Sequence, residues 1–213
     1  MNGKSLPQAV EALSHLNRNN VHKRKIDLLV LRYIAQQLHL TLQTMEQSLT
    51  DNPPFLYTAT GRHSCSHRIV LYNPSQLLQS KSLAFVGFVS GRRAGTDSSV
   101  SQELHAVDSQ MLAELARIPG LLAYSSLELR PGHWYNLVVM QSLESKAHFR
   151  QIGTHQYAAY ELAPRAYDWI RIHSGIMPDG LTGNAMNILK TKHYVYLPTD
   201  NMVSTCEVVE VIY

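Results

Sequence analysis

The sequence predicts an α+β fold whose centre is a ferredoxin-like core, with the element order β-α-β-β-α-β. Two observations predict this order. Between residues 82 and 177, β-rich runs alternate with amphipathic helical runs, and glycine- or proline-containing turns separate them. Two crossover units of this kind place both helices on one face of a four-stranded antiparallel sheet, because such crossovers are right-handed.

The first half of this core has three clear elements. "SLAFVGFVSG" (82–91) predicts the first strand, and residues 98–118 predict a helix with one apolar stripe, formed by Val100, Leu104, Val107, Met111 and Leu115. Ser99 and Gln102 have capping-box spacing at the start of this helix. "LLAYSSLEL" (121–129) predicts the second strand.

The second half begins after the turn "RPGH". "WYNLVVM" (134–140) predicts a strand antiparallel to the one before it. A helical region then opens at Ser142, which is a good N-cap, and restarts after the break at Gly153 and Thr154. "YDWIRIHSGIM" (167–177) predicts the last core strand.

The rest of the chain predicts additions to this core. Residues 5–50 are expected to be helical, a short segment first and a longer one from Val21, whose apolar positions share one face: Ile26, Val30, Tyr33, Ile34, Leu38, Leu42, Met45 and Leu49. A hairpin is expected at 55–60 and 68–73, with 73–81 as a turn and linker. Two C-terminal strands, 192–198 and 206–213, either pair with that hairpin or extend a sheet edge. We therefore predict an extension packed on the core (1–80) and a core domain (81–213).

Composition limits the class of protein. Hydrophobic residues make up 45% of the 213 residues and charged residues 16%, which is typical of a globular chain. A formal charge of +3 is too small for a dedicated nucleic-acid binder. The longest apolar run is interrupted by charges, and the start of the chain has no signal-peptide pattern. The two cysteines are far apart in sequence, so we expect a cytoplasmic protein without disulfides. We expect neither a nucleic acid nor a membrane as a partner.

The last core strand alternates between two kinds of residue. Ile170, Ile172 and Ile176 share one face and suit the helix-packed side of the sheet. The opposite face is expected to carry Tyr167, Trp169, Arg171 and His173. That mixture suits a face that is covered but not dry, which is either a ligand cavity or a subunit interface.

These residues supply the candidate catalytic groups. Arg171 could bind a carboxylate or enolate, His173 could move a proton, and Trp169 could stack on an aromatic ligand. An interface between two copies uses the same residue types equally well. His155, at a predicted helix start, is a candidate general base, with a surface histidine near a cap as the alternative.

A second candidate group lies on the strand at 134–140. Trp134 and Asn136 share a face, and the amide of Asn136 needs either a ligand or a cross-strand hydrogen bond as its partner. Trp134, Asn136, Trp169 and Tyr167 are therefore the predicted substrate-binding residues. "HSCSH" places His63, Cys65 and His67 at alternating positions, but a fourth ligand is lacking, so we predict a polar loop and no metal site.

The segments "LEL…HWYNLVVMQSLESKAHFR…THQYAAYELAPRAYDWIRIHSG" resemble the dimeric α+β barrel superfamily, which includes the antibiotic-biosynthesis-monooxygenase-like proteins. The resemblance spans 82–177. It implies a homodimer in which two sheets close into a barrel, with a small-molecule pocket between each sheet and its helices. Some members use an Asn-Trp-His set or a histidine haem ligand; His155 is nearest to that ligand, but "LAFVGFVSG" lacks the asparagine, which argues against haem degradation.

The resemblance and the residues together predict a small-molecule enzyme. We expect an apolar or aromatic substrate. We expect the reaction to be that of an oxygenase, a decarboxylase or an isomerase. The sequence specifies no cofactor, although haem is possible. One alternative is a haem-binding protein with His155 as axial ligand. Another is a non-catalytic ligand-binding or adaptor module, which the basic start of the long helix, residues 22–25, would allow to dock on a partner.

Overall fold

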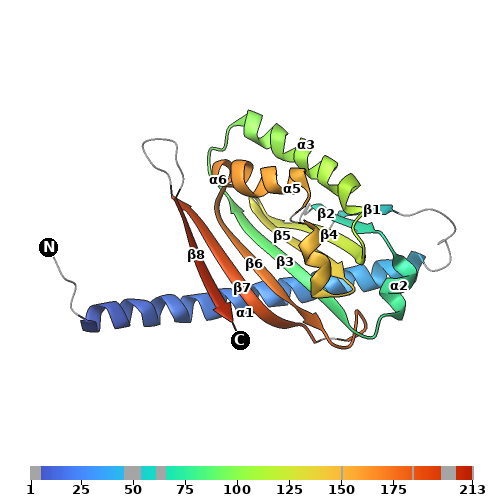
Figure 1. Cartoon of the computed structure of the whole chain (residues 1–213), viewed down its shortest axis with the longest axis horizontal. Helices are drawn as coiled ribbons and strands as arrows, with labels where there is room; N and C mark the ends of the chain where they lie inside the picture. The colour runs from blue at the N-terminus through green and yellow to red at the C-terminus, as the bar shows by residue number, and fades with distance from the viewer. Residues whose placement is uncertain are drawn as a thin grey trace.

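The structure, a computed structural model, describes residues 6–45, 54–60, 66–149, 151–183, 185–197 and 205–212, with backbone alone for 6–21, 59–60, 197 and 205–212 (Figure 1). Within these residues eight strands form one antiparallel sheet in the order β1-β2-β4-β5-β3-β6-β7-β8. The strands are β1 Phe55–Thr60, β2 Ser66–Leu71, β3 Leu83–Arg92, β4 Leu121–Arg130, β5 His133–Met140, β6 Tyr167–Met177, β7 Asn187–Leu197 and β8 Thr205–Ile212.

The four central strands confirm the ferredoxin-like core. Their order, β4-β5-β3-β6, is that of two interlocked β-α-β units. The first crossover is α3 (Ser98–Leu115). The second comprises a short 3₁₀ turn (Leu143–Ser145), α4 (Lys146–Phe149), α5 (Gly153–Tyr157), a π-helical turn (Ala158–Leu162) and α6 (Ala163–Ala166). These helices cover one face of the sheet (Figure 1).

The remaining strands extend both edges of the core. The hairpin β1-β2 joins through β4, and β7-β8 joins through β6. The C-terminal strands therefore extend a sheet edge and do not pair with the early hairpin, which settles the alternative that the sequence left open. The hairpin strands 55–60 and 66–71, predicted within the extension packed on the core, belong to the same sheet as the core.

The helix α3 packs as its apolar stripe predicts, but it starts differently. Val100, Leu104 and Val107 contact Leu162 and Ala166 of the second crossover. At the N-terminus the carboxylate of Asp97 accepts a hydrogen bond from the Ser99 N–H at 2.7 Å. The predicted capping box of Ser99 and Gln102 is wrong, because Ser99 already lies inside the helix and cannot cap it.

A second correction concerns the predicted linker at 73–81. It contains the helix α2 (Pro74–Gln79), whose N-cap Asn73 accepts a hydrogen bond from the Gln76 N–H at 3.1 Å. Proline at the first helical position and asparagine as the cap are strong start signals for a short helix. The same residues also favour turns, which is why they predicted a linker.

The other face of the sheet is covered by α1 (Leu6–Met45), a single continuous helix where two segments were expected. Its buried side chains, Val30, Leu31, Ile34, Ala35, Leu38 and Leu42, pack on inward-facing residues of β3 and β5. Gly87 permits the close approach, because a Cβ there would lie 2.5 Å from Leu31 Cδ1. The predicted single apolar stripe is only partly right: Ile26 and Tyr33 are exposed, and Leu49 lies outside the described residues.

This position of α1 changes the expected assembly. In the predicted barrel, a second copy of the sheet covers the face opposite the helices. Here the chain's own helix occupies that face, so two sheets cannot pack together there while α1 stays in place. The homodimer itself stays a prediction.

Candidate functional site

The predicted site residues lie on opposite faces of the sheet. Trp169, Arg171 and His173 point toward α1, as their alternation predicts. Tyr167 does not join them. The pairing with β3 slips between Gly91↔Trp169 and Arg92↔Tyr167, a β-bulge that turns Tyr167 to the side of α3 and α6. The expectation that Tyr167 shares their face is therefore wrong.

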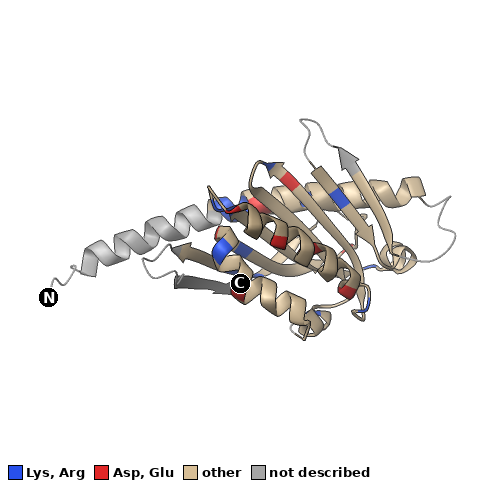
Figure 2. Cartoon of the chain, turned by 90° about the horizontal axis from the view of Figure 1, so that it is seen from above, with Lys and Arg blue, Asp and Glu red and all other residues tan. Residues whose placement is uncertain are grey.

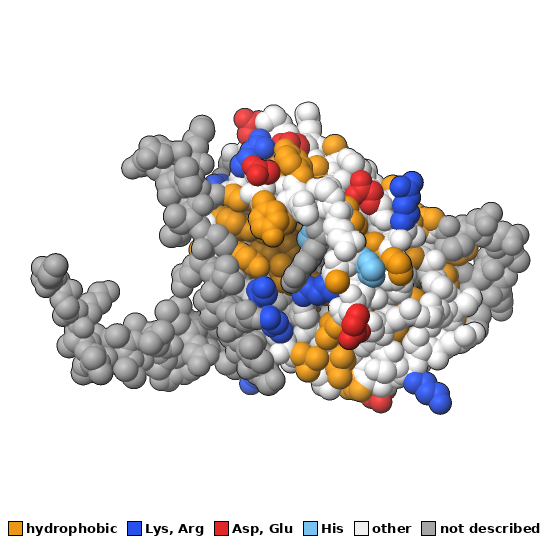
Figure 3. Space-filling model, in the orientation of Figure 1, with side chains coloured by type: hydrophobic (Ala, Val, Ile, Leu, Met, Phe, Trp, Pro, Cys, Tyr) orange, Lys and Arg blue, Asp and Glu red, His pale blue; other side chains and the backbone are white. Residues whose placement is uncertain are grey.

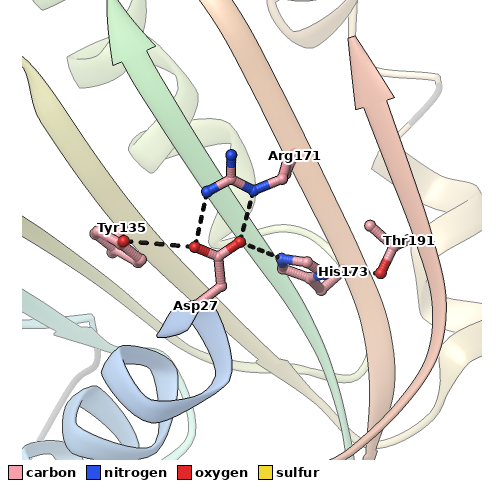
Figure 4. Close-up of polar contacts among 5 residues, drawn as sticks. All are labelled: Asp27, Tyr135, Arg171, His173 and Thr191. Carbon is pink, nitrogen blue, oxygen red and sulfur yellow. Dashed lines mark hydrogen bonds and ion pairs between the residues drawn. The ribbon is translucent and has the colours of Figure 1, made fainter. Parts of the chain in front are cut away.

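On the α1 side, Asp27 collects the polar groups (Figure 4). Arg171 donates to both carboxylate oxygens, Nε to Oδ2 at 2.6 Å and Nη2 to Oδ1 at 2.8 Å. His173 Nε2 donates to Oδ2 at 3.0 Å, and the Tyr135 hydroxyl donates to Oδ1 at 3.4 Å. The Thr191 hydroxyl lies 2.9 Å from His173 Nδ1. We call these five residues the Asp27 cluster.

The electrostatics of this cluster favour a charged carboxylate. Burial alone raises the pKa of Asp27, but hydrogen bonds from His173 and Arg171, together with the Arg171 charge, outweigh it and hold the pKa below its ordinary value. The Arg171 guanidinium stacks on the Trp169 ring at 4.1 Å from its centroid. Arg171 is thereby neutralised on one side and shielded on the other.

Asp27, His173 and Thr191 follow the order of an acid–histidine–hydroxyl relay. Asp27 and His173 have 0% exposed surface, however, and Thr191 has 8%. A substrate has no open path to this relay in the structure. The geometry therefore gives Arg171 and His173 the role of binding α1 to the sheet, and they are not accessible catalytic groups in this arrangement.

Asp27 itself is the residue that sequence reasoning missed. The signal was present: Asp27 falls at the helical spacing of Val30, Ile34 and Leu38, so it sits on the buried stripe. A carboxylate in such a stripe requires a cationic partner elsewhere in the chain.

The helix-covered face of the central strands is less densely covered. Here Val86, Phe88, Asn136, Val138 and Ile172 are partly exposed. On the α1 face of the same strands, Phe85, Val89, Leu137 and Val139 have 0% exposed surface. Figure 3 shows hydrophobic side chains gathered in a hollow beside the helices of this face. We call the partly exposed group Val86, Phe88, Trp134, Asn136 and Ile172 on this face the recess.

Unpartnered polar atoms mark this face. Trp134 Nε1, Asn136 Oδ1, Ser90 Oγ and Arg92 Nε are buried and have no hydrogen-bond partner in the described chain. The residues are neighbours: Ser90 pairs with Trp134 across β3 and β5, and Phe88 pairs with Asn136. A buried polar group without a partner costs about 1–3 kcal/mol, so a strip of them needs a physical explanation. A bound polar group would supply one.

His155 lies in the helical layer over the same face. It is half-buried on α5, its ring meets that of Phe149 edge-on at 6.3 Å, and burial lowers its pKa, so the imidazole is neutral at pH 7. Its neighbour Thr154 donates to Glu114 Oε1 at 2.9 Å, which ties α5 to α3. Of the predicted residues, His155, Trp134, Asn136 and Tyr167 thus belong to the helix-covered side.

The metal alternative finds no support in the described residues, where no three His, Cys, Asp or Glu side chains are placed to hold an ion. His63 and Cys65 lie outside the described residues, and His67 Nε2 is 2.8 Å from Ser125 Oγ. No helix in the described part of the chain has both the length and the apolar character that a membrane span requires.

Comparison with known proteins gives distant likenesses only. No protein-family profile and no curated protein matches the chain. The crystal structure of protein SO0527 from Shewanella oneidensis is similar with a TM-score of 0.39 and 11% identity, over 46% of this chain and 93% of that one. A mutant of SnoaB, a cofactor-independent oxygenase from Streptomyces nogalater, is similar with a TM-score of 0.33 and 16% identity, over 46% of this chain and 91% of that one. The ferredoxin-like assignment of β3–β6 stands on their pairing and not on these matches.

Proposed function

We propose that the protein binds a small apolar or aromatic molecule in the recess and acts on it by oxygenase, decarboxylase or isomerase chemistry. One observation carries the proposal: a partly exposed apolar hollow is lined by buried polar atoms that have no partner within the described chain. Small-molecule sites have this character, an apolar lining with a few placed polar groups.

The residues of the recess suggest how a ligand is held. The Trp134 N–H would donate to an acceptor on the ligand, and Asn136 Oδ1 would accept from a donor. Phe88 and Ile172 would pack on its apolar body. His155 is our candidate for moving a proton, because a neutral imidazole accepts one at pH 7.

A neutral aromatic probe tests whether the recess binds. N-phenyl-1-naphthylamine fluoresces in apolar surroundings, and we expect it to bind the full chain. Ile172→Trp fills the hollow and should weaken binding about tenfold or more, a loss of about 1.4 kcal/mol. Leu189→Trp, at an exposed position of β7, is the matched control and should bind as the natural chain does. Equal binding by all three proteins would place the probe elsewhere and remove the proposal.

The chemistry is tested on a ligand retained from expression and identified by mass spectrometry of the denatured protein. The three reactions differ in product: an oxygenase adds oxygen only in air, a decarboxylase releases CO₂, and an isomerase leaves the mass unchanged. His155→Gln should abolish turnover and leave ligand retention unchanged. Added haemin that develops a Soret band in the natural chain, and not in His155→Gln, would favour the haem-binding alternative.

A further inference from the structure

The recess has a polar end, next to the turn between β4 and β5. Ser90 and Arg92 continue the helix-covered face of β3, because the intervening Gly91 lies against Trp169 on the α1 side. Trp134 is the β5 partner of Ser90. Arg92 therefore lies diagonally across from Trp134, a separation that long side chains can span.

The Tyr167 hydroxyl shows on which side the Arg92 guanidinium lies. Tyr167 is the β6 partner of Arg92 and stands on the side of α3 and α6. Burial raises the pKa of Tyr167, and the positive charge of Arg92 acts in the opposite direction. The guanidinium is thus close enough to influence this hydroxyl, on the face that carries the recess.

Three hydrogen-bond donors gather at this end without an acceptor. Arg92 Nε, Trp134 Nε1 and Ser90 Oγ are buried and have no hydrogen-bond partner in the described chain. Ser90 as a whole has 0% exposed surface. The two nitrogens can only donate, whereas the serine hydroxyl can donate or accept. A group that satisfies all three must therefore be an acceptor.

Two carboxylates near this end are engaged elsewhere. Asp108 on α3 accepts from Arg68 Nη2, at 2.7 Å to Oδ2 and 3.0 Å to Oδ1. Glu128 Oε1, on the neighbouring strand β4, accepts from the Gly132 N–H at 2.9 Å. Neither carboxylate accepts from the arginine Nε–H or from the indole N–H. These two donors are the groups left for a ligand.

The other face of the sheet shows how an arginine of this fold binds a carboxylate. Arg171 holds Asp27 side-on, with Nε donating to Oδ2 at 2.6 Å and Nη2 to Oδ1 at 2.8 Å. This arrangement uses the Nε–H, which is the unpartnered group of Arg92. Paired charge-assisted hydrogen bonds of this kind are strong and suit the planar shape of a carboxylate.

We infer that the ligand of the recess is an apolar or aromatic carboxylic acid, bound as its carboxylate by Arg92 and the Trp134 N–H. This inference rests on the proposed function, because it takes the recess as the binding site. The Ser90 hydroxyl, beside Trp134, donates to the same carboxylate. The apolar body of the acid lies on Phe88 and Ile172, which are cross-strand partners on the same face.

A carboxylic acid and its amide test the inference. 1-Naphthaleneacetic acid and 1-naphthaleneacetamide share one ring system, and each is titrated at pH 7 against N-phenyl-1-naphthylamine bound to the full chain. We expect the acid to displace this probe with an affinity at least about tenfold higher than that of the amide, which is about 1.4 kcal/mol. The amide has no charge and replaces one acceptor oxygen with a donor. Equal affinities would exclude a carboxylate ligand.

Variants at the two donors test where the carboxylate lies. Arg92→Met should lower the affinity for the acid at least about tenfold, and Trp134→Phe, which keeps a ring and removes the N–H, about fivefold or about 1 kcal/mol. Arg117→Met, at an exposed position, and Trp169→Phe, on the α1 face, are the matched controls and should bind the acid as the natural chain does. An Arg92→Met protein that still prefers the acid to the amide overturns the inference.

The outcomes separate the two claims. If the probe responds to Ile172→Trp but the acid and the amide compete equally, the carboxylate is excluded while the proposed function stands. If the probe does not respond to Ile172→Trp, the recess is not the site and both proposals fail. Thermal melting shows whether each variant is folded. If Arg92→Met is not, Arg92→Lys keeps the charge without the Nε–H, and binding of the acid as tight as in the natural chain would contradict the side-on contact.

Discussion

A single buried carboxylate on α1 determines how this helix is held. Asp27 receives hydrogen bonds from Arg171 and His173, both on β6, and all three are buried. Removing one partner from such a pair leaves an uncompensated charge in the interior. We expect Asp27→Asn to lower the free energy of unfolding by about 3–5 kcal/mol, measured by urea denaturation.

The matched control is Asp168→Asn. Asp168 also pairs with an arginine, Arg93, at 3.2 Å, but its side chain is half exposed. An exposed ion pair contributes about 0–1 kcal/mol. Similar losses in the two variants would show that the Asp27 cluster does not anchor α1.

Asn136, unlike Asp27, is expected to lower the stability of the fold and to serve ligand binding. Its buried Oδ1 has no partner in the described chain, so Asn136→Leu removes an unpaired acceptor. We expect this variant to gain about 1 kcal/mol of stability and to lose the ligand retained from expression. Asn187→Leu, at an exposed position of β7, makes the same substitution away from the recess. A loss of stability in Asn136→Leu would mean that the amide is satisfied within the chain.

At the scale of the elements, the surroundings of His193 on β7 make the stability of the fold sensitive to pH. Burial, with repulsion from Arg171 and Lys23, lowers the pKa of His193 from 6.5 to about 4. A depressed histidine pKa means that the folded state binds fewer protons than the unfolded state, so stability is lost as the pH falls from about 6.5 toward 4.

Thermal melting between pH 7 and 4.5 checks this effect. His193→Gln should have a shallower dependence on pH than the natural chain, although not a flat one, because burial also lowers the pKa of His67 and His155. The lowered pKa of Asp27 affects stability in a different pH range. The stability that it contributes is fully present above the ordinary pKa of 3.8 and is lost as the pH falls further. An unchanged slope in His193→Gln would contradict the assignment.

The approach of α1 to the sheet depends on Gly87. A Cβ at this position would lie 2.5 Å from Leu31 Cδ1, closer than packed carbons come. We expect Gly87→Ala to cost about 1–3 kcal/mol. In Leu31→Ala the space is open, so adding Gly87→Ala to it should cost less than in the natural chain, and a double-mutant cycle measures the difference. Additive losses would show that the two residues do not meet.

The elements themselves were largely predictable, because alternation and helical periodicity are local. Residues 167–177 were predicted and observed as one strand with the same bounds. The errors have causes that these local patterns do not contain. The bulge that turns Tyr167 depends on the pairing of β3 with β6, and the N-cap at Asp97 depends on where the helix begins. Neither is visible in periodicity alone.

At the scale of the whole molecule, the two faces of the sheet have different uses. The α1 face is buried and closed around the Asp27 cluster, while the helix-covered face retains the partly exposed recess. Figure 2 shows acidic and basic positions interspersed over the elements in view, without an extended region of one sign. A localised recess is therefore a better candidate for recognition than the overall charge.

The candidate site was predictable in part. Period-two spacing placed Trp134 with Asn136, and Arg171 with His173, on common faces, and the structure keeps both pairs together. Period-two spacing did not reveal which element covers each face. That choice depends on a contact between residues 27 and 171, which no local pattern specifies. The predicted second copy and the observed helix both satisfy the same apolar alternation.

The position of Asp27 in the chain has a consequence for synthesis. Its partner Arg171 follows 144 residues later. At about 5–20 residues per second, a ribosome takes on the order of 10 s to make the intervening segment. During that interval the emerging helix has its apolar stripe and its carboxylate ready but nothing to dock on. Final closure of this face therefore waits until β6 has left the ribosome.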